Sequence, residues 1–277
     1  MSDILRLALI QPTSTISINR NIALIEPMIR KAVSDDAQMI SLPEVVNLTQ
    51  KNREESVKEA QFETGDAFLA RIQTLAKELD VWIHIGSNVV KLEDDARMAN
   101  RAYMINNSGE ILAHYDKIHM FDVDLEGGES YRESSSFRPG EEAVCVNTPW
   151  GLIGLTICYD VRFPQLHRTL AQAGAKLILN PAAFTRKTGS AHWHTLLTAR
   201  AIENGCFIAA AAQTGDHEDG RETYGHSLIV APWGNVLADA GTDQRIIIAD
   251  LDFSLVEKAH EMVPSLKNGR EFQLKVF

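Results

Sequence analysis

The chain has 277 residues, of which 45% are hydrophobic, and its formal net charge is −10. This length and hydrophobic content suffice for one substantial core, while the acidic balance disfavours nucleic acid and anionic membrane surfaces as partners. The first residues lack the pattern of a signal peptide, and three cysteines without paired spacing argue against a disulfide framework. We therefore expect a cytoplasmic protein that binds neither nucleic acid nor membranes.

Short apolar runs alternate with amphipathic stretches along the first 115 residues. Residues 5–10 predict a buried strand, and apolar side chains recur at helical spacing over residues 19–33. The same reasoning predicts a helix over 66–79 and strands over 38–42, 81–90, 102–106 and 111–115.

A long loop rich in glycine and serine is expected from residue 117 to residue 139. Beyond it, the pattern predicts helices over 165–173 and 191–204, a short helix and tail at the end, and strands over 144–147, 152–157, 176–179, 207–211, 227–231, 235–238 and 245–251. Alternating strands and helices with several strand pairs indicate a mixed-sheet α/β protein. No linker-like segment divides the chain, so we expect one domain over residues 1–277.

Cys158 directly follows the apolar run 152–157 and precedes a polar segment that leads into a helix. A nucleophile at such a strand end has neighbouring backbone N–H groups that can bind an oxyanion. Taken alone, a free cysteine is more often a small buried hydrophobic residue, and that interpretation holds for Cys145 and Cys206. Because an ordinary thiol is mostly protonated at neutral pH, a nucleophilic Cys158 needs an activating base.

The sequence contains no local histidine signature for that role. His192 and His194 flank Trp193 on a predicted helix, so they point to different faces and suit neither a catalytic dyad nor a metal. Two other strand ends carry charged residues: Glu44, a possible general base, and Lys117, whose ammonium would stabilise a nearby thiolate. In isolation, each is better explained as a structural residue: Glu44 as a helix cap or turn residue, and Lys117 as a solvated turn residue.

Together, these residues resemble the nitrilase (carbon–nitrogen hydrolase) superfamily, whose catalytic set is glutamate, lysine and cysteine. The resemblance covers nearly the whole chain and lies in the segments 42–44 (LPE), 115–122 (YDKIHMFD), 154–164 (GLTICYDVRFP), 180–184 (NPAAF), 188–193 (TGSAHW), 224–227 (YGHS) and 232–234 (PWG). It implies a four-layer α-β-β-α sandwich with two mixed sheets and a homodimer or higher homo-oligomer. It also implies that no metal and no organic cofactor is required.

The resemblance assigns a role to each matching residue. Cys158 would be the nucleophile, Glu44 the base, and Lys117 with the backbone N–H of Tyr159 would hold the oxyanion. A second glutamate would orient the lysine and the substrate; Glu133 matches its position best, and Glu129 in the same loop is the alternative. The reaction would pass through a thioester that water then hydrolyses. Residues expected to contact the substrate are Phe121, Tyr159, Asn180, Ala183 and Phe184.

Within the superfamily, the segments 119–122, 159–164 and 188–193 resemble the branch of deaminated glutathione amidase and the ω-amidases, and 217–227 favours the former. Those substrates carry a carboxylate, which a guanidinium can bind through two hydrogen bonds. Arg162 and Arg221 are the candidates, although a structural ion pair explains each equally well. Arg186 and Lys187 could add positive charge near the mouth of the site. The expected activity is hydrolysis of a C–N amide bond in a small carboxylated amide, with deaminated glutathione (α-ketoglutaryl-Cys-Gly) as the preferred candidate.

Several alternatives stay open. An ω-amidase would act on α-ketoglutaramate or α-ketosuccinamate, and a true nitrilase would act on a small nitrile. The nitrilase is disfavoured because Tyr159 and Asp160 follow the cysteine, where true nitrilases usually carry Trp-Glu. A non-catalytic binding or scaffold protein could retain the fold. A histidine-assisted cysteine protease lacks the required histidine spacing.

Overall fold

The computed structural model describes residues 4–125, 128 and 130–277. Its first sheet has seven strands in the order β17-β1-β2-β4-β5-β6, with β3 paired alongside β4. Strands β1, β2 and β4 are mutually parallel and the remaining path is antiparallel, so the sheet is mixed. The strands are β1 (Ile4–Gln11), β2 (Met39–Ser41), β3 (Gln61–Phe62), β4 (Trp82–Lys91), β5 (Met98–Ile105), β6 (Ile111–Asp116) and β17 (Arg245–Asp252).

The second sheet has six strands in the order β16-β15-β12-β11-β10-β9. Its centre, β10-β11-β12, is parallel, and antiparallel strands flank it on both sides. The strands are β9 (Val144–Thr148), β10 (Gly151–Leu155), β11 (Leu177–Leu179), β12 (Phe207–Ala210), β15 (Leu228–Val230) and β16 (Val236–Asp239).

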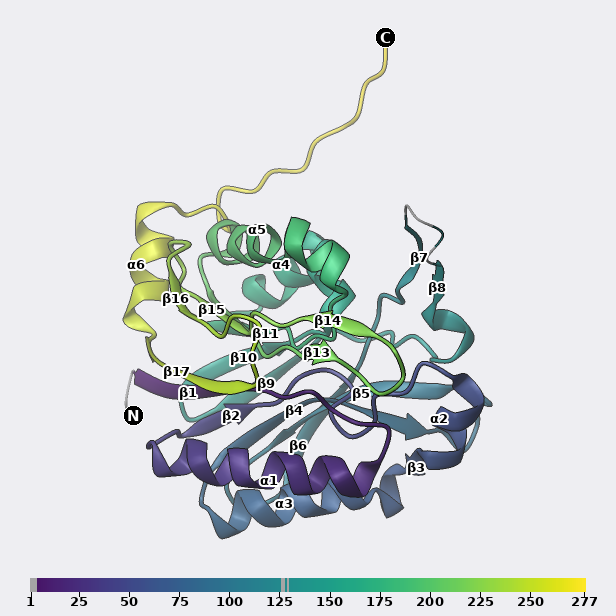
Figure 1. Ribbon diagram of the computed structural model, residues 1–277. Helices are drawn as coiled ribbons and strands as arrows, with labels where there is room; N and C mark the ends of the chain where they lie inside the picture. Colours follow the sequence, from purple (N-terminus) through teal and green to yellow (C-terminus); the bar gives the residue numbers. More distant parts are fainter. Residues whose placement is uncertain (1–3, 126–127, 129) are drawn as a thin grey trace.

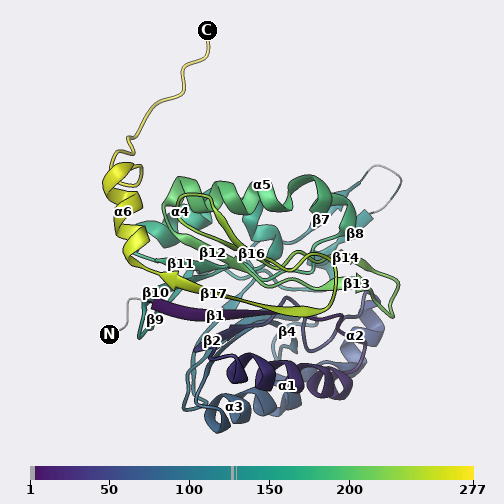
Figure 2. The same cartoon turned by 60° about the vertical axis from the view of Figure 1, so that its left-hand side comes forward.

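Helices cover the outer face of each sheet (Figure 1). Helices α1 (Ile18–Ser34) and α3 (Ala67–Glu78) pack on the first sheet, and α4 (Pro164–Gln172) and α5 (Arg186–Asn204) pack on the second. Helix α6 (Ser254–Met262) follows β17 at one edge, and the tail beyond it extends away from the body (Figure 2). The expected four-layer α-β-β-α sandwich with two mixed sheets is confirmed.

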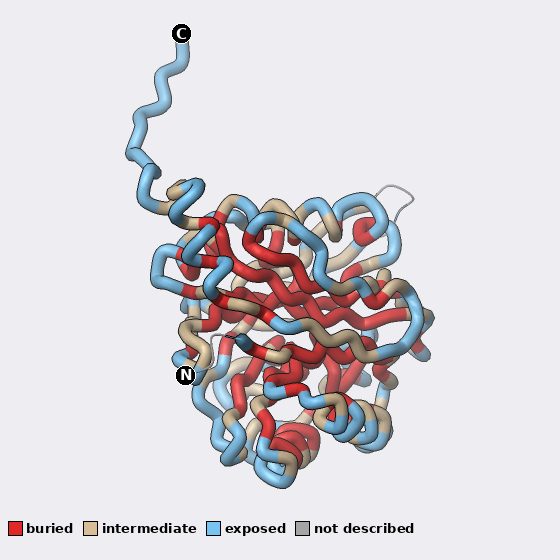
Figure 3. Tube along the Cα trace, turned by 90° about the vertical axis from the view of Figure 1, so that its left-hand side faces the viewer, coloured by how far each residue is buried: buried red, intermediate tan, exposed pale blue. Residues whose placement is uncertain are grey.

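Strand β1 shows why the two layers of core form. Leu5, Leu7 and Leu9 lie in the core cluster that joins the two sheets, whereas Ala8 and Ile10 lie in the cluster beneath α1 and α3. Successive side chains of a strand point to opposite faces, so one apolar run can fill both cores. The buried part of the chain is accordingly concentrated in the strands (Figure 3). No helix in the described part of the chain is long and apolar enough to cross a membrane.

The sequence pattern missed some elements and misplaced some boundaries. Helix α5 begins five residues before the expected 191, because the Thr185 side chain caps it by accepting from the Thr188 N–H. Strand β10 ends at Leu155 rather than at 157. The expected loop 117–139 contains the hairpin of β7 (Asp122–Asp124) and β8 (Ser130–Arg132). The pattern also gave no sign of α2 (Arg53–Glu59) or of the hairpin formed by β13 (Thr214–Asp216) and β14 (Glu222–Tyr224).

Candidate active site

Cys158 opens a short 3₁₀ turn three residues after β10 ends. Its φ is +49°, a left-handed conformation that costs energy for any residue with a side chain. A backbone hydrogen bond holds this turn in place: the Cys158 N–H donates to the carbonyl of Pro181 at 2.8 Å. Because Tyr159 is in the first turn of this 3₁₀ segment, its N–H is among those that have no partner within the helix. The strained backbone therefore presents a thiol together with an N–H donor.

Asp160 fixes the conformation of this turn. Its carboxylate is fully buried and accepts from the Ile157 N–H at 2.8 Å, from the Tyr115 hydroxyl at 2.6 Å and from the backbone N–H of His119 at 3.1 Å. The His119 ring also lies 2.6 Å away through Nδ1. Buried carboxylates are tolerated when their lone pairs are used in this way. Asp160 thus connects the turn that begins at Cys158 to the segment that carries Lys117.

Glu44 lies just beyond β2 and is 4% exposed. One carboxylate oxygen accepts from Lys117 Nζ and from Asn100 Nδ2, both at 2.8 Å, and the other accepts from the Ala183 N–H at 2.7 Å. Gly86 makes this arrangement possible, since a Cβ there would collide with the carbonyl oxygen of Leu42. The close approach of β4 holds the Leu42–Glu44 segment rigidly against the site.

Lys117 follows β6 and is 2% exposed. Its ammonium lies 2.8 Å from Glu44 and 2.9 Å from each oxygen of Glu133. Glu133 also accepts from the Phe121 N–H at 2.6 Å and from Asn100 at 3.2 Å. Of the two glutamates weighed from the sequence, Glu133 therefore contacts the lysine, whereas Glu129 lies outside the described residues.

The charges of this cluster determine which groups are ionised. Burial raises the pKa of the Cys158 thiol well above its usual value, and the neighbouring charge of Glu44 adds to the effect despite Lys117. Burial also pushes the pKa of Glu44 upward, but the charge and hydrogen bond of Lys117 outweigh it, so the pKa lies below its ordinary value. The pKa of Lys117 is well above its usual value, because two carboxylates overcome the effect of burial. The resting site thus holds a neutral thiol beside an ionised Glu44.

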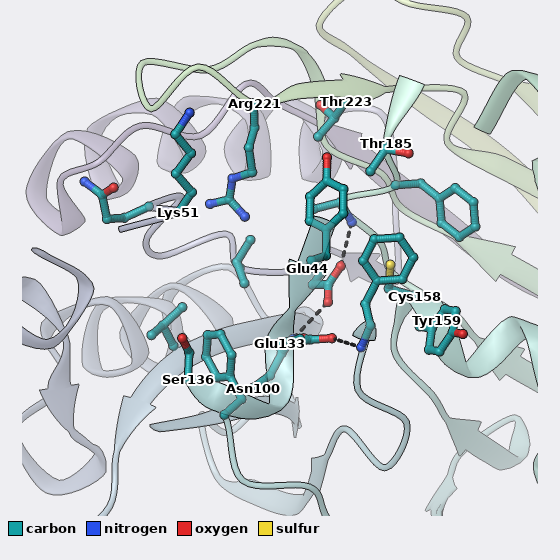
Figure 4. A pocket seen from close by; sticks show the side chains of 18 of the residues that line it. Glu44, Lys51, Asn100, Glu133, Ser136, Cys158, Tyr159, Thr185, Arg221 and Thr223 are labelled. Atoms are coloured by element: carbon teal, nitrogen blue, oxygen red, sulfur yellow. Dashed lines mark hydrogen bonds between the residues drawn. The ribbon is translucent and has the colours of Figure 1, made fainter. Parts of the chain in front are cut away.

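A cavity of 720 Å³ opens above these residues. Glu44, Glu133 and Cys158 meet at one end of it, while Lys51 and Arg221 lie on the side away from Cys158 (Figure 4). The volume lies within the range of roughly 300–1,000 Å³ that is typical of small-molecule sites. Away from the catalytic cluster, the charged residues of the wall are mostly basic: Lys51, Arg53, Arg132, Arg186, Lys187 and Arg221, against Glu222.

Most of the expected substrate-contacting residues line this cavity: Phe121, Tyr159, Ala183, Phe184 and Arg221. Asn180 does not reach it. It is completely buried and donates to the carbonyl of Cys158 at 3.4 Å. Arg162 is also not among the described lining residues, and its guanidinium packs 5.4 Å from the ring centroid of Phe184 and 5.9 Å from that of Tyr159. Asn180 thus supports the turn that begins at Cys158, and Arg162 packs against two aromatic residues of the wall.

Asn100, Tyr115 and Lys51 were not identified from the sequence as part of the site. Asn100 is a polar residue in β5, a strand whose residues are mostly apolar and buried. A polar side chain in such a strand is the signal by which Asn100 could have been found. Tyr115 resembles an ordinary strand residue, and Lys51 an ordinary exposed loop residue. Their positions depend on tertiary contacts between segments that are far apart in the chain.

Comparison with known proteins identifies relatives of this chain. The carbon-nitrogen hydrolase family model matches residues 6–261. A deaminated glutathione amidase from Synechocystis sp. is 38% identical over 264 residues, which cover 94% of this chain and 96% of the relative. The nitrilase and fragile histidine triad fusion protein NitFhit from Caenorhabditis elegans is 38% identical over 266 residues. That match covers 95% of this chain but 60% of the fusion protein, so the chain spans less than two thirds of that relative.

Two solved structures share the fold over nearly the whole chain. The C. elegans NitFhit structure has a TM-score of 0.91 at 37% identity and is matched over 97% of this chain and 66% of that one. A mutant amidase from Nesterenkonia sp. AN1 shows covalent addition of the acetamide moiety of fluoroacetamide at its active site cysteine. It has a TM-score of 0.82 at 26% identity, covering 96% of this chain and 94% of that one. On these matches, the chain belongs to the carbon–nitrogen hydrolase family and has the nitrilase fold.

Proposed function

We propose that the protein is an amidase that hydrolyses a C–N bond in a small carboxylated amide through a thioester on Cys158. The observation that carries this proposal is the convergence of Glu44, Lys117 and Cys158 at one end of the same cavity. A thiol, a carboxylate that is already ionised and an ammonium are the nucleophile, base and oxyanion partner that acyl transfer requires.

The reaction divides into two steps with Glu44 as the proton carrier. In the first, Glu44 removes the thiol proton as Cys158 Sγ attacks the amide carbon. Lys117 and the Tyr159 N–H stabilise the negative charge that develops on the oxygen. The same proton passes from Glu44 to the leaving nitrogen as the C–N bond breaks, which leaves the thioester. In the second, Glu44 takes a proton from water as the resulting hydroxide attacks the thioester, and the departing Cys158 thiolate takes that proton from Glu44 as the C–S bond breaks and the acid is released.

Glu133 acts as a positioning residue in this scheme. It holds Lys117 through both carboxylate oxygens and fixes the loop through the Phe121 N–H. An ammonium that is paired with two carboxylates stays protonated while Glu44 changes its charge during the cycle. The oxyanion partner is therefore retained in both steps.

The preferred substrate is deaminated glutathione. Its carboxylates suit the basic wall of the cavity, and Arg221 is the best placed cation. Asp219, whose side chain is 1% exposed, holds the Arg221 Nε at 2.7 Å, so that the guanidinium points into the cavity (Figure 4). A guanidinium fixed in this way can bind a carboxylate with little further loss of freedom. The amidase from Synechocystis sp. is named for the same substrate.

A substrate panel tests the activity and its specificity. Release of amine or ammonia is measured with deaminated glutathione, α-ketoglutaramate, glutamine, asparagine and one nitrile paired with its matching amide. Highest kcat/KM for deaminated glutathione supports the proposal. Faster turnover of α-ketoglutaramate would make the protein an ω-amidase, and faster turnover of the nitrile would make it a nitrilase. Absence of hydrolysis across the panel would favour a non-catalytic binding protein.

We further propose that residues 1–277 work as one catalytic domain in a cytoplasmic homodimer or higher homo-oligomer. Strands of both sheets lead to the site, which supports a single domain, and free thiols at all three cysteines suit a reducing compartment. Large apolar side chains, which a partner subunit could bury, are exposed near α5, α6 and the tail: Ile202, Trp233, Val236, Met262, Phe272 and Leu274. Light scattering would support association by giving twice the chain mass or more, and monomer mass would contradict it.

A further inference from the structure

Three side chains outside the catalytic cavity meet between α5, β16 and the turn before β15. They are His194, Asp239 and His226, respectively. The Asp239 carboxylate lies 2.9 Å from His194 Nε2 and 2.9 Å from His226 Nδ1. One ligand atom from each residue lies within 4.8 Å of the other two. None of the three is among the described residues that line the cavity, so the cluster is separate from the amidase chemistry.

The donor atoms of these three side chains are of the types that bind transition metals. Two imidazole nitrogens and one carboxylate oxygen are the protein ligands of many three-ligand zinc sites, in which water takes the fourth position. The side chains are between 21% and 37% exposed, which lets an ion enter and leaves room for that water. We propose that His194, His226 and Asp239 form a binding site for a divalent transition-metal ion, for which Zn²⁺ is the best match.

The backbone around His226 supports the proposal independently. His226 has a φ of +55°, a conformation that is strained for any residue other than glycine. The turn maintains it through two hydrogen bonds: the His226 N–H donates to Gly241 at 2.7 Å, and its carbonyl accepts from Trp193 Nε1 at 2.8 Å. Strain of this kind persists where the surrounding structure enforces it, often at a functional position. Here it aims the imidazole at Asp239.

The groups behind the ligands are also ordered. The Tyr224 ring stacks on His226 with 4.5 Å between centroids, and the Gly241 N–H donates to Asp239 Oδ1 at 2.8 Å. Such outer contacts fix the orientation of metal ligands in established sites. The cluster therefore has both the inner donors and the supporting partners of a built site.

Metal binding requires only small changes in this arrangement. In the metal-free state each ring donates an N–H to the shared carboxylate, and binding moves each proton to the other ring nitrogen. The two ring nitrogens lie 2.9 and 3.2 Å from Asp239 Oδ2, and atoms around a tetrahedral zinc with bonds of about 2.0–2.1 Å are roughly 3.3 Å apart. These two distances therefore change by a few tenths of an ångström, and the two ring nitrogens, which lie within 4.8 Å of each other, must reach the same separation.

A bound ion would connect three elements behind the cavity wall. Tyr224 donates its N–H to the Phe184 carbonyl at 2.9 Å, and its ring fills the space beside Gly189, where a Cβ would collide with it. Fixing His226 and His194 to one ion would therefore hold β14 against α5. Because the ion binds the folded chain, it should raise the melting temperature.

Zinc titration of the tag-free, chelator-treated protein tests the proposal. Calorimetry and dialysis followed by metal analysis should give one Zn²⁺ for each chain. His194→Ala, His226→Ala and Asp239→Asn should each weaken binding by about tenfold or more and remove the rise in melting temperature. His192→Ala is the matched control, because this exposed histidine lies on the same helix and should leave affinity unchanged.

Two readouts separate this site from other possibilities. Cobalt substitution should give a visible spectrum without the thiolate band that Cys158 would produce, and Cys158→Ala should bind zinc as the wild type does. Asp239→Asn preserves side-chain shape, so it remains informative if His226→Ala fails to fold, as judged by circular dichroism. Absence of zinc binding, or binding that survives all three ligand substitutions, would overturn the proposal.

Discussion

The Tyr115 hydroxyl donates a 2.6 Å hydrogen bond to the buried carboxylate of Asp160, joining the strand that leads to Lys117 to the turn that begins at Cys158. Both partners are almost completely buried, at 1% and 0% exposure. The bond crosses from one sheet to the other, so it helps to set the distance between Cys158 and Lys117, although neither partner lines the cavity.

Replacing Tyr115 with phenylalanine should therefore reduce both stability and turnover. Leaving the buried Asp160 short of one donor should cost about 1–3 kcal/mol in the free energy of unfolding. A small displacement of Cys158 from Lys117 should lower kcat by about tenfold with little change in KM. Tyr103→Phe is the matched control, because its hydroxyl also donates to a carboxylate, Glu63, on the far side of the sheet. Equal loss of kcat in both variants would contradict the coupling.

The pH–rate profiles of the Glu133→Gln and Glu44→Gln variants should differ in shape. Glu133 positions Lys117, so its amide variant should lose about 10²-fold in kcat/KM while the shape of the pH–rate profile is retained. Glu44 transfers protons, so Glu44→Gln should lose roughly 10²–10⁴-fold and its profile should lack the acid limb. Glu142→Gln, at an exposed position, should match the wild type. If the profile of Glu133→Gln lacked the acid limb, proton transfer would have to be assigned to Glu133 and the positioning of Lys117 to Glu44.

Arg221→Ala should discriminate against anionic substrates in particular. Loss of charge-assisted hydrogen bonds of about 1.5–3 kcal/mol should lower kcat/KM for a carboxylated amide by roughly 10–100-fold. The value for a neutral amide should change little, since it has no carboxylate for Arg221 to bind. Arg245→Ala, on β17 and outside the described cavity lining, is the control. An equal loss of kcat/KM for carboxylated and neutral amides would show instead that Arg221, which pairs with Asp219, has a structural role.

Two buried histidines should make the protein less stable in weak acid. Burial lowers the pKa of His84 to about 3 and that of His167 to about 4, from an ordinary value of 6.5. Below pH 6.5 the unfolded chain binds protons at these rings that the folded chain does not, so stability present above that pH is lost progressively toward pH 3 to 4. The expected loss is about 2 kcal/mol for each histidine between about pH 7 and about pH 5.

Urea unfolding at several pH values measures this loss. His84→Asn keeps a group able to meet the Ser41 hydroxyl, which lies 2.9 Å from His84 Nδ1, and should reduce the loss between about pH 7 and about pH 5 by about 2 kcal/mol. His114→Asn, at an exposed position, should leave the dependence unchanged. A His84→Asn protein with the full wild-type slope would show that other groups cause the acid sensitivity.

Strand ends could be predicted from local pattern, and the family resemblance then singled out the charged and thiol residues at three of them. Glu44, Lys117 and Cys158 each come shortly after an apolar strand, and the ends of neighbouring strands lie close together in such sheets. The strands and the long helices were identified for the same reason, because periodicity is a local property. Boundaries were less accurate: Thr185 extended α5 through a cap that periodicity does not register.

Residues whose position depends on distant contacts were not predicted. Asn100 reaches Glu44, and Tyr115 reaches Asp160, across 56 and 45 residues of sequence. The spacing of His192 and His194 describes one helix only, and on that helix it disfavours a metal site. The side chains that lie beside His194 in the structure come from β16 and from the turn before β15, so spacing along one helix does not reveal them. Arg162 was a candidate by charge, and in the structure its guanidinium packs over Phe184 and the residue is not among those described as lining the cavity.

The most direct test of the account is amide hydrolysis by Cys158→Ala. With folding checked by circular dichroism, the account predicts that release of amine falls by about 10³-fold or more, because no other group can form the thioester. Cys206→Ala, which removes a buried thiol whose pKa burial raises to about 12, should retain turnover if it folds. Cys145→Ala, at a half-buried thiol outside the described cavity lining, should retain it as well. Hydrolysis by Cys158→Ala at a rate close to that of the wild type would contradict the mechanism.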